Sequence, residues 1–379
     1  TTTDTNIGFA TGIALMGALT MTTGTAAGSA GNITLADSIN GAQALTLTAG
    51  DGHVVFDTDT TGSTPVTAHV GQTTALTSLT VSGNNITLRD VKTTGVQSYT
   101  AAGTIDTNST YITDGANITF AGATVANSSL VIDTTNAGTA TTDGDVTFTS
   151  TLDSQATEAN GLTITAGGGD INFDGAVGAG TNAALGAVTI NSAATLDTDG
   201  VFKAASFTQA AGSVLTQFDG TVTLTGNFDF TGTALTFNAS GNTVGGTMDV
   251  TNSGVFTTAD IADITVTGQF TQDGTSTSSL GGNLTATAGM NFKTAIALMG
   301  NDAVTLATGG AAGQDIVLGT DNTTDMTGSG QALTLNAGAA GDITIEGDIG
   351  AASAALGALI ITSADQVLFD ETVTAASFK

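Results

Sequence analysis

One stretch of the sequence, Leu162 to Phe207, returns later in the chain as Leu333 to Phe378. Both copies contain apolar-Thr-apolar or similar apolar triplets, the tripeptide Ala-Leu-Gly and a closing Ala-Ala-Ser-Phe. A looser third copy begins at Ala44. The copies share a rhythm of strands and turns and not a reactive side chain. Internal repetition at this scale is typical of stacked supersecondary units, so it argues against a globular enzyme.

Most of the chain consists of apolar-Thr-apolar triplets separated by Gly, Ala, Asn, Asp and Ser. This alternation places two apolar side chains on one face of a strand and the threonine on the other. β-Branched residues favour strands, and the turn-forming residues end each strand after a few positions. Examples are Ile33-Thr34-Leu35, Ile86-Thr87-Leu88, Ile118-Thr119-Phe120 and Val146-Thr147-Phe148. No long segment has apolar residues at helical spacing, so we predict little helix.

We predict an all-β protein in which residues 1–379 form one continuous solenoid, a parallel β-helix with two or three short strands per coil. Coils of about twenty residues would give roughly 18 to 20 coils. Segments 1–101, 146–207 and 284–379 are related, and 210–290 diverges through additional phenylalanines that we interpret as core residues. Tandem β-sandwich domains are the alternative. They are less favoured because the chain has no Trp, two Tyr and one Pro.

The formal net charge of −28 argues against nucleic acid and anionic membranes as partners, because both would be repelled. Only 10% of the residues are charged and 40% are hydrophobic, so the chain is expected to fold. The uncharged segment Ile7 to Thr20 is shorter than the roughly 20 residues that span a bilayer. Its core recurs at Phe292 to Gly300. We therefore interpret it as repeat strand and predict no membrane span.

Short acidic loops are the main candidates for a bound ion. They offer carboxylate oxygens on turns, which suits calcium, a hard cation. The candidate ligands are Asp57, Asp59, Asp143, Asp145, Asp170, Asp197 and Asp199. The phrase Gly169-Asp170-Ile171 is similar to the nonapeptide calcium repeat, but it does not recur every nine residues. Solvated turns without an ion are the alternative interpretation, and no other cofactor is predicted.

Catalytic groups are sparse. The sequence has no cysteine, and we interpret its two histidines, His53 and His69, as turn residues. Parallel β-helices include polysaccharide-cleaving enzymes, so paired carboxylates are considered as acid and base. The pairs are Asp170 with Asp174 and Asp342 with Glu346. They occupy repeat-equivalent turn positions, which indicates turn chemistry. We predict that the protein is not an enzyme.

Several phrases recur in similar form. Segments such as ALTLTAG, GDITI, ALGALII and VTAASF stand at or near Ala44, Asp170, Ala184, Asp342, Ala355 and Val373. In these residues the chain resembles the haemagglutination-type filamentous adhesins and the giant bacterial surface proteins built of β-strand repeats. The resemblance implies a right-handed parallel β-helix, export to the cell surface or extracellular space, and a role as a fibre, adhesin or matrix component.

Neither end of the sequence carries a charged capping unit, although the outermost coils of a solenoid need capping. One explanation is a longer array. The other, which we prefer, is head-to-tail stacking of subunits into a filament. The predicted function is therefore an extracellular structural protein of a surface filament, sheath or matrix, with other copies of the chain as partners. The alternative is an adhesin shaft or glycan-binding passenger segment that recognises glycans through exposed Thr and Asn.

Overall fold

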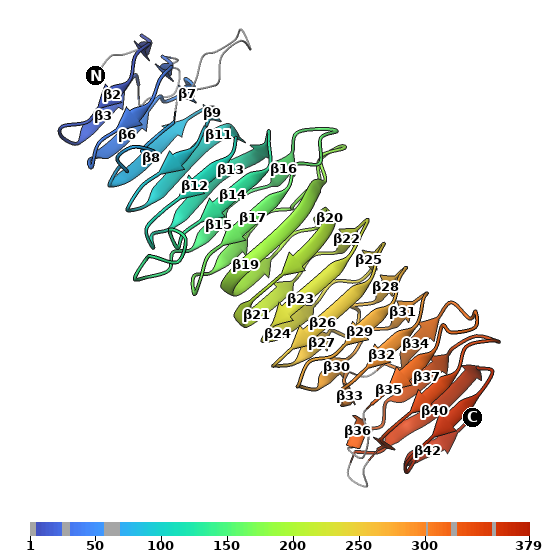
Figure 1. The fold of residues 1–379 in the computed structure, drawn as a ribbon. Helices are drawn as coiled ribbons and strands as arrows, with labels where there is room; N and C mark the ends of the chain where they lie inside the picture. Colours follow the sequence, from blue (N-terminus) through green and yellow to red (C-terminus); the bar gives the residue numbers. More distant parts are fainter. Residues whose placement is uncertain (1–4, 25–30, 57–68, 301, 320–323, 351–353) are drawn as a thin grey trace. The chain divides into compact units, whose positions relative to one another are not determined.

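The computed structural model describes the chain except for residues 1–4, 25–30, 57–68, 301, 320–323 and 351–353. It divides into two compact units, residues 1–199 and 200–379. Each unit is a parallel β-solenoid (Figure 1), and the coils of the chain number about 16. The described residues contain no helix.

Unit 1 is built of short strands, each of which pairs in parallel with the equivalent strand of the next coil. For example, Val146 lies opposite Ile171 and Phe148 lies opposite Phe173. Its strands are β1 (Ile7–Phe9), β2 (Ile13–Ala14), β3 (Leu19–Thr22), β4 (Ile33–Leu35), β5 (Ile39–Asn40), β6 (Ala44–Thr48), β7 (Val54–Phe56), β8 (Ser78–Gly83), β9 (Ile86–Thr87), β10 (Val91–Lys92), β11 (Gln97–Thr107), β12 (Thr110–Ile112), β13 (Ile118–Ala126), β14 (Leu130–Asp133), β15 (Val146–Phe148), β16 (Leu152–Ser154), β17 (Leu162–Thr165), β18 (Ile171–Phe173) and β19 (Leu185–Thr198).

The core of unit 1 consists of columns of inward-facing side chains. In the triplets, the two apolar residues are buried and the residue between them is partly exposed, as in β15. One column is aromatic: the rings of Phe120 and Phe148 stack with centroids 4.8 Å apart, and those of Phe148 and Phe173 with centroids 5.3 Å apart. Stacked rings add dispersion and quadrupole terms to the burial of apolar surface.

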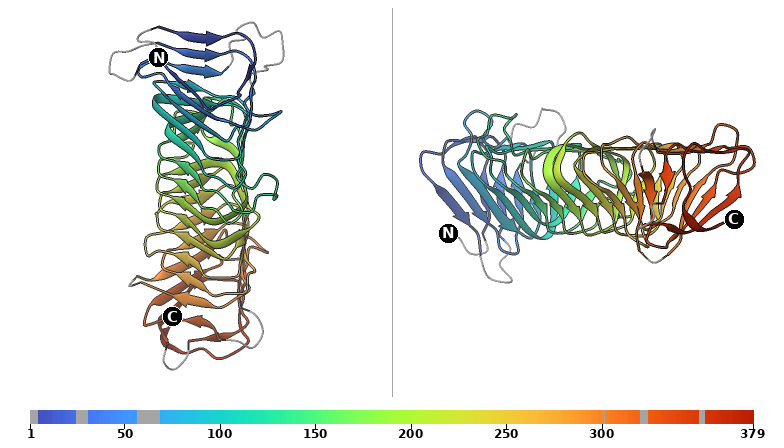
Figure 2. Two further views of the ribbon diagram at one scale, coloured as in Figure 1. Left: turned by 90° about the vertical axis from the view of Figure 1, so that its left-hand side faces the viewer. Right: turned by 90° about the horizontal axis from the view of Figure 1, so that it is seen from below.

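Unit 2 follows the same plan (Figure 2). Its strands are β20 (Phe202–Gln209), β21 (Gly212–Phe218), β22 (Val222–Leu224), β23 (Phe228–Gly232), β24 (Ala234–Phe237), β25 (Asn242–Val244), β26 (Met248–Asn252), β27 (Phe256–Thr258), β28 (Ile264–Val266), β29 (Phe270–Gln272), β30 (Ser278–Leu280), β31 (Leu284–Ala286), β32 (Met290–Phe292), β33 (Ile296–Leu298), β34 (Val304–Thr308), β35 (Ile316–Leu318), β36 (Thr324–Thr327), β37 (Ala332–Asn336), β38 (Ile343–Ile345), β39 (Asp348–Ile349), β40 (Leu356–Ser363), β41 (Val367–Phe369) and β42 (Ala375–Phe378).

The phenylalanine-rich segment 210–290 forms part of the core of unit 2, in agreement with its interpretation from sequence. The six phenylalanines are all buried: Phe218, Phe228, Phe230, Phe237, Phe256 and Phe270. The rings of Phe218 and Phe237 stack across neighbouring coils with centroids 5.3 Å apart. The additional aromatic residues therefore fill the interior and do not form a lateral contact face.

The two sequence copies also share an irregularity of the backbone. In unit 1 the register between β17 and β19 shifts after the pair Ile164 and Ile190, so that Thr165 lies opposite Ser192. In unit 2 the register between β37 and β40 shifts at the corresponding place, where Asn336 lies opposite Ser363. Each shift marks an extra residue in one strand, which is a β-bulge.

The predicted parallel β-solenoid fold is confirmed, and tandem sandwiches are wrong, because the strand pairings of each unit are parallel between successive coils. That residues 1–379 form one continuous solenoid stays a prediction. The coils are fewer than predicted because some are longer. Equivalent positions lie 20 residues apart at Val222 and Asn242 but 28 apart at Asn117 and Asp145. The segment Ile7 to Thr20 supplies β1, β2 and the start of β3, as predicted. In the described part of the chain, no helix has the length and apolar character to cross a bilayer.

Candidate functional site

A row of side-chain hydrogen bonds, which we call the polar ladder, connects the corners of successive coils. The Oδ1 atom of Asn117 accepts the backbone N–H of Asp145 at 2.9 Å, and Oδ1 of Asp145 accepts that of Asp170 at 3.0 Å. Oδ1 of Asp170 then accepts the backbone N–H of Thr195 at 3.2 Å and its hydroxyl at 2.7 Å. Other acceptor and donor pairs in unit 1 are Asn6 and Asn32, Asn32 and His53, and Asn85 and Thr104.

Unit 2 has the same arrangement. Oδ1 of Asp315 accepts the backbone N–H of Asp342 at 2.9 Å, and Oδ1 of Asp342 accepts that of Gln366 at 3.1 Å. A second run connects Asp263, Asn283 and Thr305. At these corners the backbone donor would otherwise lack a partner, and unpaired donors in a partly buried backbone are costly. Stacked strands with identical polar residues in register commonly form such ladders.

Glycines next to the polar ladder allow the coils to come close together. A Cβ atom on Gly169 would lie 2.3 Å from the carbonyl oxygen of Gly144, and a Cβ on Gly144 would lie 2.3 Å from the carbonyl of Ala116. A Cβ on Gly341 would lie 2.8 Å from the carbonyl oxygen of Gln314 on the preceding coil. The phrase Gly-Asp-Ile thus combines a residue for close approach, a ladder acceptor and a core residue.

The structure gives three of the seven proposed calcium ligands a role in turns. Asp145 and Asp170 belong to the polar ladder, and Oδ2 of Asp143 accepts the backbone N–H of Gly168 at 2.8 Å. The carboxylates of Asp197 and Asp199 have oxygen atoms within 4.8 Å of each other. The remaining two candidates, Asp57 and Asp59, lie outside the described residues. Calcium binding stays a prediction.

The candidate acid and base pairs are held apart by a strand. Asp170 directly precedes β18 and Asp174 directly follows it, and Asp342 and Glu346 flank β38 in the same way. Four residues of extended chain span about 13 Å, whereas the two carboxyls of a glycosidase lie about 5 to 9.5 Å apart. Asp170 and Asp342 also serve as ladder acceptors. This geometry favours the interpretation of these residues as turn chemistry.

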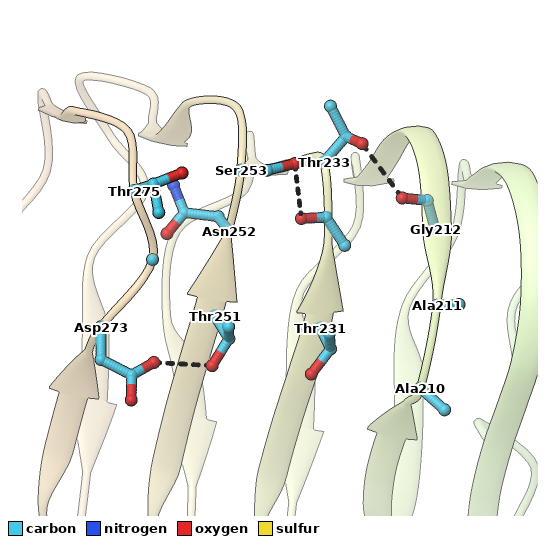
Figure 3. Close-up of a pocket in the computed structure, with 12 residues that line it drawn as sticks. Ala210, Ala211, Gly212, Thr231, Thr233, Thr251, Asn252, Ser253, Asp273 and Thr275 are labelled. Atoms are coloured by element: carbon cyan, nitrogen blue, oxygen red, sulfur yellow. Dashed lines mark hydrogen bonds between the residues drawn. The ribbon is translucent and has the colours of Figure 1, made fainter.

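A surface groove of about 340 Å³ crosses successive coils of unit 2 at one corner (Figure 3). We call it the unit 2 groove, and small and hydroxyl-bearing residues form its walls. In register, Thr231 lies opposite Thr251 and Gly232 lies opposite Asn252. The lining residues are Ala210, Ala211, Gly212, Thr231, Gly232, Thr233, Thr251, Asn252, Ser253, Asp273, Gly274 and Thr275.

One carboxylate lies at the wall of the unit 2 groove. The hydroxyl of Thr251 donates to Oδ1 of Asp273 at 2.6 Å, and Oδ2 of Asp273 lies 3.7 Å from Nζ of Lys293. Further along the corner, the hydroxyl of Thr233 donates to the carbonyl of Gly212 at 3.1 Å (Figure 3). The groove therefore presents hydroxyl groups, methyl groups and one carboxylate, and no arrangement of nucleophile and base.

The two histidines have different surroundings. His53 occupies a position of the polar ladder, where its backbone N–H donates to Asn32. His69 lies in a separate pocket of unit 1, and its Nδ1 atom is 2.8 Å from Oδ2 of Asp90. Sequence reasoning placed both histidines on turns but missed the pairing with Asp90. The two residues meet because Val70 and Val91, which follow them, lie opposite each other on neighbouring coils.

The comparisons with known proteins add no relative. No protein family model, no curated protein and no solved structure matches the chain, so its resemblance to filamentous adhesins stays a prediction from the repeated phrases.

Proposed function

We propose that the chain is an extracellular structural protein whose solenoid coils stack on those of another copy to form a filament or matrix. This proposal rests on a contrast between inner and outer coils. In the inner coils both edges of each strand are paired, whereas the outermost described coils leave apolar side chains uncovered on an open edge. Open edges of this kind promote addition of further strands.

The open edge of unit 2 is formed by β41 and β42. Among the described residues, β41 pairs only with β38, and β42 only with β40. Val367 and Phe378, which lie opposite the core residues Ile343 and Leu359, are 40% and 60% exposed. One coil further in, Ile343 of β38 is fully buried. The apolar residues of β41 and β42 are thus those that another coil would cover.

The open edge of unit 1 is formed by β1 and β3. Within the described part of the chain, β1 pairs only with β4, and β3 only with β6. Phe9 on β1 is 41% exposed, whereas Leu35, which lies opposite it on β4, is 1% exposed. This edge therefore also leaves core-type side chains uncovered.

The polar ladder suggests a register for the contact between copies. Gln366 precedes Val367, as Asn6 precedes Ile7, so the side-chain oxygen of Gln366 would accept the backbone N–H of Asn6 of the next copy. Val367 would then cover Ile7, and Phe378 of β42 would cover Leu19 of β3. Each proposed pair repeats a pairing made between coils within a unit, such as that of Asp342 with Gln366. The stacking would be heterologous and open, which produces filaments.

Electron microscopy and sedimentation velocity of the purified chain test this proposal. We expect fibres of constant width and a concentration-dependent increase in sedimentation coefficient. Val367→Lys places a charge on the open edge and should prevent assembly, because stacking would bury this charge against an apolar column without a partner. Val214→Lys, at a 54% exposed position within β21, is the matched control and should assemble normally. A wild-type chain that stays monomeric at every concentration, or a Val367→Lys variant that still forms fibres, contradicts the proposal.

The unit 2 groove supports a second candidate function, the binding of a neutral glycan. Its hydroxyl groups and the Asp273 carboxylate offer hydrogen bonds to sugar hydroxyls, and its alanine and threonine methyl groups offer apolar contact. A glycan array probed with the chain tests this function. Ala211→Trp fills the groove and should abolish binding, whereas Ser213→Trp, at a neighbouring exposed position that does not line the groove, should not. Absence of any bound glycan, or equal effects of the two variants, argues against it.

A further inference from the structure

A pocket of about 300 Å³ in unit 1 gathers rare residue types of this chain. Its lining consists of His69, Arg89, Asp90, Asn108, Ser109 and Ser128. Arg89 is the only arginine in the sequence, and His69 is one of two histidines, in a chain with 33 acidic residues. Two of the rare groups that can carry positive charge thus face one cavity. We call it the Arg89 pocket.

The Arg89 pocket is assembled from the corners of successive coils. Val70 lies opposite Val91, Val91 opposite Tyr111, and Tyr111 opposite Ile132. The lining residues all stand shortly before these paired positions, so they come to the same corner although they are far apart in sequence. The pocket therefore has a wall of regular strands behind it, which holds the side chains in fixed positions.

His69 and Asp90 form an oriented pair at one side of the pocket. Oδ2 of Asp90 lies 2.8 Å from Nδ1 of His69, while its Oδ1 accepts the backbone N–H of Thr110 at 2.9 Å. The Asp90 carboxylate is thus held by the backbone of Thr110 on one oxygen and lies against the imidazole with the other. The imidazole is 41% exposed, so its Nε2 atom is the ring nitrogen that can meet a ligand.

The pocket lining also supplies neutral hydrogen-bonding groups. The hydroxyl oxygen of Ser128 accepts the backbone N–H of Ser109 at 3.1 Å, which leaves the hydroxyl hydrogen able to donate. The Asn108 amide donates from Nδ2 to the carbonyl of Leu88 at 3.4 Å, and its Oδ1 remains an acceptor. Ser109 has a positive φ of 74°, a conformation that is uncommon outside glycine and that often marks binding sites.

We propose that the Arg89 pocket binds a carboxylate-bearing sugar, that is, a uronic acid unit. The planar fork of a guanidinium matches a carboxylate in shape and charge, and such hydrogen bonds are stronger than neutral ones. The amide and hydroxyl groups of Asn108, Ser109 and Ser128 match the hydroxyl groups of a sugar ring. The rest of the chain carries a large negative charge and repels carboxylates, so binding is confined to this pocket. This site is independent of the stacking edges and of the unit 2 groove.

Isothermal titration of the whole chain with glucuronate, glucose and acetate tests the proposal. Glucuronate should bind with a measurable Kd, glucose should not bind, and acetate should bind more weakly than glucuronate because it lacks hydroxyl groups. Arg89→Gln should weaken glucuronate binding by at least about tenfold, the effect of one charge-assisted hydrogen bond. Arg89→Lys keeps the charge but loses the fork, so its effect should be intermediate.

Lys92→Gln is the matched control, because it changes the net charge equally at a nearby residue that does not line the pocket. It should leave glucuronate binding within about twofold of the wild type, since a surface charge contributes little. Circular dichroism checks that each variant is folded. If Arg89→Gln is not folded, His69→Gln and the chemical shifts of the Arg89 Nε–H on titration replace it. Equal binding of glucose and glucuronate, equal effects of Arg89→Gln and Lys92→Gln, or no binding of glucuronate at all would each overturn the proposal.

Discussion

The carboxylate of Asp145 accepts the backbone N–H of Asp170 at 3.0 Å, and its own backbone N–H donates to Asn117 at 2.9 Å. Asp145 is thus both donor and acceptor in the polar ladder. Asp145→Ala should destabilise the chain by about 1 to 2 kcal/mol, because it leaves a backbone donor without a partner. Asp145→Asn keeps the acceptor oxygen and should cost much less. Urea denaturation followed by circular dichroism measures both, and equal losses for the two variants would contradict a hydrogen-bonding role.

The polar ladder leads to a prediction about the effect of calcium on stability. Asp143, Asp145 and Asp170 already accept hydrogen bonds from the backbone of the next coil. We expect calcium to raise the melting temperature no more than magnesium does at equal ionic strength, since both ions then only screen the negative charge. Thermal denaturation with each ion and with a chelator is the measurement. A calcium-specific increase that disappears in Asp143→Asn would show a real site, because that variant removes a charged ligand.

His53 interrupts the polar ladder. It stands at the ladder position that Asn32 and Asn85 occupy on the neighbouring coils. Its Nδ1 atom is buried and has no hydrogen-bond partner among the described residues. His53→Asn restores a ladder oxygen and should stabilise the chain by about 0.5 to 1.5 kcal/mol, the typical net contribution of one hydrogen bond. The midpoint of urea denaturation reports the change. His53→Gln, whose longer side chain does not match the ladder geometry, should give a smaller gain, and a loss of stability in His53→Asn would refute the assignment.

Gly169 is required for close approach of two coils. Its added Cβ would lie 2.3 Å from the carbonyl oxygen of Gly144, which belongs to the backbone and cannot turn aside. Gly169→Ala should therefore destabilise the chain by about 1 to 3 kcal/mol, the usual cost of overpacking. Gly8→Ala is the matched control, because no atom lies within 4 Å of that Cβ position. Denaturation curves that show equal stability for the two variants would disprove the requirement.

We expect titration of the Asp229 carboxyl to make the free energy of unfolding depend on pH. Burial raises the pKa of its carboxyl from the ordinary value of 3.8, and the charge of Asp249, which lies opposite on the next coil, raises this pKa further. An acid whose pKa is raised by folding costs stability when it is ionised. The cost is absent below 3.8, grows as the pH rises from 3.8 toward the raised pKa, and is fully present above the raised pKa.

Asp229→Asn should accordingly stabilise the chain at pH 7 and have no effect near pH 3. Denaturation of both proteins across this range measures the difference. Asp249→Asn removes only the neighbouring charge, which is the lesser cause, so its gain at pH 7 should be smaller. A stabilisation by Asp229→Asn that is equal at pH 3 and pH 7 would exclude titration as its cause.

The solenoid could be predicted because its determinants are local. The alternation within a triplet such as Val146-Thr147-Phe148 predicts which side chains are buried. The turn-forming residues around the triplet predict where the strand ends. The role of Gly169 and Asp170 as turn residues was also visible, since Gly341 and Asp342 repeat them. The hydrogen bond between coils was not visible, because it depends on which residue of the next coil lies opposite.

The pockets could not be predicted for the same reason. His69 and Asp90 meet because Val70 and Val91, which follow them, are paired 21 residues apart. Coil length varies along the chain: paired positions lie 18 residues apart at Leu79 and Gln97 but 34 apart at Leu45 and Leu79. Insertions in the turns hide the period, so the sequence alone does not tell which corners are superposed. Polar residues recur before Val70, Val91, Tyr111 and Ile132, and this recurrence could have indicated the Arg89 pocket. It can be recognised only when the register of the coils is known.

Where the polar ladder is unbroken, a coil supplies one acceptor for the coil that follows it and one donor for the coil before it, as Asp145 and Asp170 show. A duplicated coil brings both groups with it, and a deleted coil removes both. Gene duplication or loss in units of one coil therefore leaves no orphaned polar group behind. Chains of this design can lengthen or shorten during evolution without any compensating substitution.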